Sequence, residues 1–529
     1  MNISTLIDHL SRPAAYPHAV NDVDVRQTHV SVVFLAGPFV YKIKKPLELG
    51  FLDFSTLEKR AHFCAEEVRL NRRLAPAIYL GVVPVTQCAS EIRFEGQGSV
   101  VEWAVKMERL PEKATLLERL YYGEIDVPLM RTLARKIANF HTYADAGEHI
   151  SAFGSFPYVA RNARENFEQT NPLVGTTINS AVFQRLVTLN EDTLAQLRPL
   201  IERRARQGVP RDTHGDLHLD HVYFFPHEVP PKQLVIIDCI EFNERFRFAD
   251  PVADMAFLVM DLIFHGRRDL AQEFARAYFQ KMHDPSGWEL LPFYTAYRAA
   301  VRGKVEGFEL LEKEIPGEEK SSALARARAH WLMALGELEK SSRKPCLVLV
   351  GGLPGSGKST LACALAHQAN FQMIRSDLVR KELAGLSQSE TAPAPFGEGL
   401  YAPELIERTY GECLRRAPDL LFAGNRVLID ASFGAEQRRR DFLSLAYRLG
   451  VPAIFFLCRA DPQTIRRRLQ HRRHDASDAD WSVFLRSVEL WEEVGPQTSP
   501  FLHVISNQER PEDAASQALA YLRARQLVD

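Results

Sequence analysis

The chain has 529 residues, of which 46% are apolar and 25% are charged, and its formal net charge is −2. This composition excludes disorder as the main state, because it supplies enough apolar surface to offset the entropy of the chain. The length predicts two large domains or about three of ordinary size. Because 65 basic residues are balanced by 67 acidic ones, no global positive field points to nucleic acid as a partner.

Membrane insertion and secretion are also disfavoured. The longest apolar stretches, 346–350 and 451–458, are far shorter than the roughly 18 residues that a membrane-spanning helix needs. Residues 1–20 lack the apolar core of a signal peptide. The seven cysteines are scattered and never form a CxxC pair, which argues against a disulfide framework or a structural zinc site. We therefore expect a cytoplasmic protein.

The first part of the chain opens with the pattern of a β-hairpin. Val30–Phe34 and Phe39–Ile43 alternate apolar and polar residues around a turn at Gly37. Further elements are expected as a helix at 56–74, a strand at 100–106, and mostly helix from 127 onward with a break near 210–240. A small β-rich lobe followed by a larger helical lobe is the plan of an α+β, protein-kinase-like bilobal fold.

The second part alternates short apolar strands with amphipathic helices. It follows a helical stretch at 321–338 and a polar segment, 339–345, which ends in proline and reads as a linker. The strand candidates are Cys346–Val350, Phe371–Ile374, Arg426–Ile429, Ala453–Leu457 and Phe501–Ile505. Strands separated by helices predict crossover connections and a parallel sheet, hence an α/β domain. We expect two domains, 1–340 and 345–529.

Residues 352–360 match the phosphate-loop pattern GxxxxGK[ST] at every fixed position. The glycines let several backbone N–H groups point at one phosphate, Lys358 reaches the outer phosphates, and the Ser359 hydroxyl joins the Mg²⁺ shell. The alternative, a flexible glycine turn before a helix, is disfavoured because an apolar strand precedes the motif and a helix at 361–368 follows it. The expected nucleotide-binding residues are Gly352, Leu353, Pro354, Gly355, Ser356, Gly357, Lys358, Ser359 and Thr360.

Acidic residues follow the second and third strands of this part. Asp377 is placed to orient or deprotonate an acceptor hydroxyl, and Arg380, one helical turn on, is suited to hold an anionic substrate. Asp430 ends its strand and is expected near Mg²⁺ or the substrate. The alternative for both aspartates is N-capping of the next helix, which is common after a strand.

Ten arginines fall within residues 438–473. Arginines near a phosphoryl donor neutralise charge in the transition state and are often carried on a lid, whereas the alternative is a solvated helix face. Ten arginines cannot all be catalytic. The candidates are Arg438, Arg466, Arg468 and Arg472.

The order of these elements resembles the P-loop small-molecule and polynucleotide kinases, including the zeta-toxin-like group. The phosphate loop is followed by the Ser-Asp-x-x-Arg element at 376–380, the Asp-Ala-Ser element at 430–432 and the arginine-rich segment. The resemblance covers roughly 345–529. It implies an ATP-dependent kinase that uses Mg²⁺, with Lys358, Asp377 and Arg380 as catalytic residues and Ser359 and Asp430 at the metal.

A second constellation begins at His214-Gly-Asp216-Leu-His218. An apolar run and Asp238 follow, 22 residues after Asp216. In a kinase-like site, a first aspartate accepts or orients the proton of the acceptor hydroxyl and a second one binds Mg²⁺. The motif resembles the aminoglycoside phosphotransferase and choline kinase family, over roughly 25–340. This resemblance implies Asp216 as the catalytic base and Asp238 as a metal ligand.

The same resemblance implies further nucleotide contacts. Lys42 is similar to the phosphate-contacting lysine of that family, Glu67 to the helix carboxylate that pairs with it, and Met107 to the start of the hinge that meets adenine through its backbone. Lys44 is the alternative to Lys42, because the two lysines share a strand face. Together with the second part, the chain resembles bacterial fusions of a phosphotransferase-like domain with an ATP-binding domain.

One residue departs from the family pattern. The family usually places asparagine, a second Mg²⁺ ligand, five residues after the catalytic aspartate, where this chain has His221. Imidazole suits Zn²⁺ and other softer metals better than Mg²⁺, so this domain is expected to be slow, altered in metal use or catalytically silent. A rival hypothesis takes His214, His218 and His221 as a metal site on one helical face, which Gly215 disfavours. His141 is interpreted as a packing histidine.

The sequence therefore predicts an ATP-dependent phosphotransferase with two nucleotide-binding domains, each transferring a phosphoryl group to a hydroxyl of a small molecule. The alternative is a C-terminal P-loop kinase regulated by a catalytically silent, ligand-binding N-terminal domain. ATP and Mg²⁺ are the expected cofactors. A nucleic-acid acceptor is disfavoured because basic and acidic residues balance in the second part. Nothing in the sequence assigns the acceptor or an oligomeric state.

Overall fold

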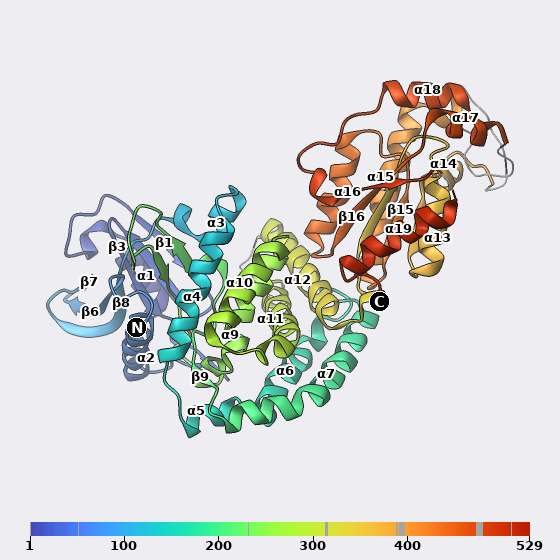
Figure 1. The fold of residues 1–529 in the computed structure, drawn as a ribbon. Helices are drawn as coiled ribbons and strands as arrows, with labels where there is room; N and C mark the ends of the chain where they lie inside the picture. The colour runs from blue at the N-terminus through green and yellow to red at the C-terminus, as the bar shows by residue number, and fades with distance from the viewer. Residues whose placement is uncertain are drawn as a thin grey trace. The chain divides into compact units, whose positions relative to one another are not determined.

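The computed structural model describes residues 2–50, 52–230, 232–312, 316–387, 390, 397–471, 480–508 and 510–529. It divides into two compact units (Figure 1). The first comprises 1–160, 197–263 and 267–294, and the second comprises 161–196, 264–266 and 295–529. The domain boundary near residue 340 stays a prediction, because these units group residues by packing and cut through helices.

A six-stranded antiparallel sheet forms the β-rich part of the first unit, in the order β1-β2-β3-β8-β6-β7. Its strands are β1 Val23–Gln27, β2 Ser31–Ala36, β3 Phe39–Lys44, β6 Tyr79–Cys88, β7 Glu91–Phe94 and β8 Ser99–Glu108. Successive residues of β8 face opposite sides, as strand geometry requires. Ala104 packs with α1 (Ile3–Leu10), and Val105 packs with α2 (Leu57–Asn71). A short pair, β4 Glu48–Leu49 and β5 Leu52–Asp53, precedes α2.

The remaining elements before residue 340 are mostly helical, as the sequence predicts. The helices are α3 Leu116–Tyr121, α4 Val127–Tyr143, α5 Glu148–Phe153, α6 Phe156–Thr170, α7 Ser180–Arg206, α8 Glu244–Arg247, α9 Pro251–Phe264, α10 Arg268–Met282, α11 Gly287–Glu309 and α12 Gly317–Leu338. The predicted break holds two short antiparallel pairs, β10 Val222–Phe224 with β11 Leu234–Ile236, and β9 Arg211–Asp212 with β12 Phe248–Ala249. The loop that carries Asp216 lies between β9 and β10.

The second unit contains a five-stranded, all-parallel sheet in the order β14-β15-β13-β16-β17. The strands are β13 Leu347–Gly351, β14 Gln372–Arg375, β15 Val427–Asp430, β16 Ala453–Arg459 and β17 Leu502–Ser506. Each lies where an apolar run predicts a strand. The helices are α13 Lys358–Gln368, α14 Ser376–Leu383, α15 Pro403–Phe422, α16 Glu436–Arg448, α17 Pro462–His471, α18 Trp481–Glu489 and α19 Pro511–Ala524.

Helices cover both faces of this sheet. In β13, Leu347 and Leu349 pack with α15 and α16, whereas Val348 and Val350 pack with α13 and α19. A strand buried on both sides must be apolar at every position, which explains the continuous run in the sequence. The fold class is thus confirmed as a kinase-like region followed by an α/β P-loop domain. No helix among the described residues combines the length and the apolar character that a membrane crossing requires.

Candidate functional site

The phosphate loop connects the end of β13 to the start of α13. Leu353 and Pro354 lie in the turn, and Thr360 lies in the first helical turn. The loop needs glycine: Gly357 has a φ of +85°, and a Cβ added there would lie 2.0 Å from Nδ2 of Asn507. That side chain donates a hydrogen bond from Nδ2 to the Ser356 carbonyl, 3.0 Å away. The Asn507 side chain therefore ties the loop to the residue that follows β17, while the amides of Gly352 and Ser356 donate to the carbonyls of Ser432 and Leu353.

Asp430 lies beside this loop because β15 is the neighbour of β13. The register pairs Val350 with Asp430. The carboxylate is 4% exposed, and within the described residues its Oδ1 has no hydrogen-bond partner. Burial raises the pKa of Asp430, while Lys358, Ser359 and Arg375 favour its charged form. A hydroxyl and a carboxylate are oxygen donors of the kind Mg²⁺ takes, so Ser359 and Asp430 fit that ion.

Asp377 and Arg380 form an ion pair at the same edge of the sheet. Arg380 Nη1 donates to Asp377 Oδ1 at 2.7 Å, and both side chains are less than one fifth exposed. Arg375, at the end of β14, lies 3.3 Å from Asp430 through Nε. Since β14 and β15 are adjacent parallel strands, their carboxyl ends bring these groups together. Asp430 therefore lies beside the strand that leads into the phosphate loop, the Asp377 charge acts on it, and the catalytic roles of Asp377 and Arg380 stay predictions.

The structure separates the four candidate arginines. Arg438 pairs with Glu407 at 2.9 Å and lies over the Tyr410 ring, and Arg466 lies over the Trp481 ring. Arg472 lies outside the described residues. Arg468, on α17, has its Nη1 3.5 Å from the position of a Cβ added at Gly357. That nitrogen is buried without a hydrogen-bond partner in the described part of the chain, and burial lowers the pKa of Arg468. Of the candidate arginines that the structure describes, Arg468 is thus the one found beside Gly357 of the phosphate loop.

In the first unit, an ion-pair set around the buried Glu67 joins β3, α2 and the loop after β11. Lys42 Nζ lies 2.9 Å from Glu67 Oε1 and 2.7 Å from Asp238 Oδ1. Burial alone would lower the pKa of Lys42, but Asp238 and Glu67 raise it well above the ordinary lysine value. The charge of Lys42 in turn helps hold the pKa of Asp238 below its usual range, against the effect of burial. Lysine, helix glutamate and metal-binding aspartate are the parts that position ATP in kinase-like sites.

Lys44 has a different environment from Lys42. Its ammonium lies 2.7 Å from Glu67 Oε2, pairs with Glu241 and lies over the Phe54 ring. The side chain is 1% exposed, against 15% for Lys42. Lys44 is therefore enclosed by protein, and Lys42 is the more exposed of the two lysines.

The Asp254 carboxylate fixes the loop that carries Asp216 through hydrogen bonds from its backbone. The backbone N–H groups of Gly215 and His214 donate to Asp254 Oδ1 and Oδ2, at 2.8 and 3.2 Å. Asp254 also bonds His141. His214 accepts from the Asp216 N–H through Nδ1 and bonds the Ile237 carbonyl through Nε2 at 2.9 Å. Asp254, His141 and His214, all buried, thus fix the backbone that carries Asp216. His141 is buried against Asp254 and Tyr278, in agreement with its interpretation as a packing histidine.

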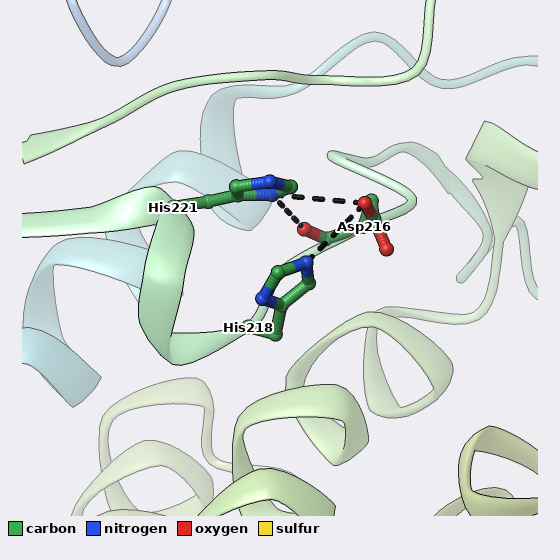
Figure 2. A group of neighbouring side chains, drawn as sticks. All are labelled: Asp216, His218 and His221. Carbon is green, nitrogen blue, oxygen red and sulfur yellow. Dashed lines mark hydrogen bonds and ion pairs between the residues drawn. The ribbon is translucent and has the colours of Figure 1, made fainter. Parts of the chain in front are cut away.

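Asp216, His218 and His221 converge above this loop (Figure 2). Their ligand atoms lie within 4.8 Å of one another, and the two imidazole rings are 3.9 Å apart. His214 is not part of the group, so the rival metal site does not form in the way the sequence spacing indicated. His221 Nε2 also lies 3.6 Å from Asp238 Oδ2. The pair formed by His221 Nε2 and Asp238 Oδ2 does not fit Mg²⁺, because one of its two donors is an imidazole nitrogen and Mg²⁺ takes oxygen ligands.

Met107 lies near the end of β8, paired with Val40 and Tyr79. The amides that follow it, those of Glu108 and Arg109, donate to the carbonyls of Ile78 and Pro38 at 2.9 and 2.8 Å. These two donors are already engaged within the sheet. An adenine at the predicted hinge would bond the chain elsewhere along this segment.

Sequence reasoning missed the residues that support these groups. Glu241 neutralises Lys44, and Asn71 accepts the Cys239 N–H at 2.9 Å, next to Asp238. Asn507 supports the phosphate loop. Of these residues, only Asn507 could have been proposed from the sequence, because it is a polar residue directly after the last strand of a parallel sheet. The others act across long sequence separations that no local pattern records.

The fold and the two sites define the class of an ATP-dependent phosphotransferase. Residues 51–293 match the family described as "Phosphotransferase enzyme family", and residues 347–493 match the one described as "AAA domain". Uncharacterized proteins of Mycobacterium tuberculosis and Mycobacterium bovis are 32% identical over 465 residues, covering 87% of this chain and 89% of theirs. The chain belongs to the family of these mycobacterial proteins, and it is an ATP-dependent kinase.

Solved structures show similarity to each half. An amicoumacin kinase has a TM-score of 0.38 at 10% identity, covering 63% of this chain and 93% of its own. A choline/ethanolamine kinase family protein from Mesorhizobium loti has a TM-score of 0.34 at 11% identity, covering 60% and 92%. A gluconokinase from Sinorhizobium meliloti has a TM-score of 0.26 at 16% identity, covering 36% and 95%. The assignment rests on the family matches and the site geometry rather than on these low scores.

Proposed function

We propose that the protein carries two ATP-dependent phosphotransferase sites, each of which transfers the γ-phosphoryl group to a hydroxyl of a small molecule. The observation that carries this proposal is the Lys42–Glu67–Asp238 ion-pair set, which keeps the parts of a working nucleotide site in the first unit. The phosphate loop supplies the second site. A domain that only served as a scaffold would not need the buried Glu67 to hold Lys42 beside Asp238, whose side chain is 42% exposed.

In the first site, Lys42 contacts the phosphates and Asp216 accepts the proton of the acceptor hydroxyl as its oxygen bonds to phosphorus. The bond between that phosphorus and the β-phosphate oxygen breaks, and ADP leaves. Asp254 holds the loop so that the Asp216 carboxylate stays in position.

In the second site, the loop amides, Lys358 and Arg468 hold the phosphates of ATP. Ser359 and Asp430 would hold Mg²⁺, which supplies charge neutralisation on the triphosphate when bound. Asp377 accepts the proton of the acceptor, and Arg380 orients the Asp377 carboxylate through its hydrogen bond to Oδ1.

The acceptors are proposed to be small molecules in the cytoplasm. All seven cysteines are free thiols, as suits a reducing compartment. No basic surplus accompanies either site to hold a nucleic acid.

A second candidate function rests on His221, which stands beside Asp238 where an oxygen donor is expected. In this case the first unit binds a ligand or ATP without turnover and regulates the P-loop kinase. The difference between the two candidates is whether Asp216 takes part in chemistry.

The experiment is to measure bound nucleotide per chain and ATP turnover for wild type, Asp216→Asn and Lys358→Ala. Two nucleotides per chain, with each variant losing a separate part of the turnover, support two active sites. Turnover that is lost entirely in Lys358→Ala and unchanged in Asp216→Asn would reject the first candidate in favour of the second.

A further inference from the structure

We infer that the first site takes a nitrogen-accepting divalent ion of the first transition row, such as Mn²⁺, rather than Mg²⁺, with His221 Nε2 and Asp238 Oδ2 as its protein ligands. The inference rests on the proposed function only in that ATP phosphates would complete the coordination shell. The ligand pair itself is a feature of the folded chain.

The orientation of His221 is the first argument. Its Nδ1 lies 2.9 Å from the Asp216 backbone carbonyl, an acceptor only, so Nδ1 carries the proton and donates it (Figure 2). The lone pair of the neutral ring is then on Nε2, which lies 3.6 Å from Asp238 Oδ2. A metal-binding histidine typically donates its other N–H to a carbonyl or carboxylate in this way, which fixes the tautomer and the ring plane.

The orientation of Asp238 is the second argument. Lys42 takes Oδ1 at 2.7 Å, which leaves Oδ2 on the side of His221. The backbone at Asp238 has a φ of +65° and is held by Tyr79, whose hydroxyl accepts the Asp238 N–H at 3.2 Å. Both ligands are therefore fixed by neighbours, and neither needs to change rotamer to meet an ion.

The separation of the two ligand atoms fits a shared cation. Adjacent ligands around an ion with bonds of about 2.1 Å lie roughly 3 Å apart. The observed 3.6 Å between Nε2 and Oδ2 requires a small closing movement. With Nε2 unprotonated, the two atoms are both electron-pair donors, and a cation between them removes their repulsion.

The chemistry of the pair sets the ion. Mg²⁺ prefers oxygen ligands and gives up water reluctantly, whereas affinity for imidazole rises along the first transition row. Mn²⁺ also accepts triphosphate oxygens in octahedral geometry. A site that offers one imidazole and one carboxylate thus favours Mn²⁺ over Mg²⁺, in contrast to the all-oxygen pair Ser359 and Asp430 in the second unit.

The test measures Mn²⁺ binding to the full-length chain by electron paramagnetic resonance, without nucleotide, in the Asp430→Asn background, which removes the carboxylate that would hold an ion in the second site. Added to this background, His221→Asn is expected to weaken Mn²⁺ binding at least tenfold and to reduce the preference for Mn²⁺ over Mg²⁺ in competition. Asp238→Asn is expected to weaken it as well. His227→Asn is the matched control, because His227 is an exposed histidine six residues further on, and it should leave binding unchanged. Thermal melting checks that each variant is folded.

Three results would overturn the inference. The first is equal Mn²⁺ affinity with and without His221→Asn, and the second is equally strong competition by Mg²⁺ in the parent chain. The third is loss of Mn²⁺ binding in His218→Asn but not in His221→Asn, which would assign the ion to Asp216 and His218 instead. Binding of a non-hydrolysable ATP analogue to the first unit is measured separately. Selective Mn²⁺ binding without nucleotide binding would reject the proposed function and keep the inference, whereas nucleotide binding with equal use of Mg²⁺ would do the opposite.

Discussion

His141 and Asp254, both fully buried, are joined by a 3.0 Å hydrogen bond from the imidazole Nε2 to the carboxylate Oδ2. Tyr278 lies 2.7 Å from the other ring nitrogen, and the same carboxylate accepts the backbone N–H groups of Gly215 and His214. A chain of buried side chains thus reaches from the helical core to the residue before Asp216. The stability of the core and the position of the candidate base are coupled through it.

Removing His141 should damage both properties. In His141→Ala, one oxygen of the buried Asp254 loses a partner, which should lower the free energy of unfolding by about 2–4 kcal/mol. Because the loop then loosens, kcat at the first site should fall more than the KM for ATP rises. Urea denaturation and steady-state kinetics measure the two effects.

His149→Ala is the matched control for that prediction. His149 also pairs with a carboxylate, Glu244 at 3.2 Å, but its side chain is 70% exposed. An exposed pair of this kind contributes at most about 1 kcal/mol. A loss of stability in His149→Ala equal to that in His141→Ala would contradict the argument from burial.

Replacing Lys42 should impair nucleotide binding, whereas replacing Lys44 should impair folding stability. Lys42→Met removes the phosphate contact and should abolish ATP binding at the first site. Lys44→Met leaves Glu67 and Glu241 buried with one cation fewer, and should cost about 3–5 kcal/mol of folding stability. Calorimetric ATP titration and thermal unfolding separate the two outcomes. The assignment would be reversed if Lys44→Met remained stable and lost nucleotide binding, while Lys42→Met bound ATP normally.

Gly357 should be difficult to replace, because its φ is positive and Asn507 occupies the space that a side chain would take. An added methyl would lie 2.0 Å from Asn507, so Gly357→Ala should displace that side chain and lower ATP affinity at the second site at least tenfold. Gly385 has a similar φ of +72°, and no atom of the described residues lies within 4 Å of its added Cβ. Gly385→Ala should therefore cost only about 1 kcal/mol of backbone strain and leave ATP binding intact. Comparable loss of affinity in the two variants would show that φ strain, rather than the contact, dominates.

Much of the fold could be predicted because its signals are local. The strands of the parallel sheet are buried on both faces, so each appears as a run of apolar residues, and the phosphate loop is a continuous motif. The choice between Lys42 and Lys44 could not be made locally. Both lie on one strand face, and they differ only in partners contributed from about 200 residues away, Asp238 and Glu241. In the sequence Arg468 is one of several equivalent arginines, and only the fold brings it close to Gly357 and Asn507.

Glu306 should make the second unit sensitive to acid. Burial would raise its pKa, but His330 at 2.7 Å, Arg302 and Arg326 together lower it. A carboxyl group whose pKa is lower in the folded state binds fewer protons there, so its contribution is present above the unfolded value and is lost as pH falls. Stability should therefore decline below about pH 4.5, the ordinary range of glutamate. Glu306→Gln should reduce this decline, as measured by urea denaturation between pH 3.5 and 6. An unchanged acid slope would assign the pH dependence to other carboxylates.

Arg468 should be the arginine of α17 on which the second site depends. Its guanidinium has a nitrogen that is buried beside Gly357 without a hydrogen-bond partner in the described part of the chain, and a phosphate of ATP would satisfy it. An arginine that stabilises the transferring phosphoryl group contributes about 10³-fold or more to kcat. Arg468→Ala should therefore lower kcat by two to three orders of magnitude, and Arg468→Lys should recover part of it because the charge returns without the planar fork. Arg438→Ala is the control, since Arg438 is already paired with Glu407 and covers Tyr410, and its turnover should stay within about threefold of wild type. If Arg438→Ala were the more damaging change, the phosphate-facing role would belong to α16, and the unpartnered nitrogen of Arg468 would have only a structural explanation.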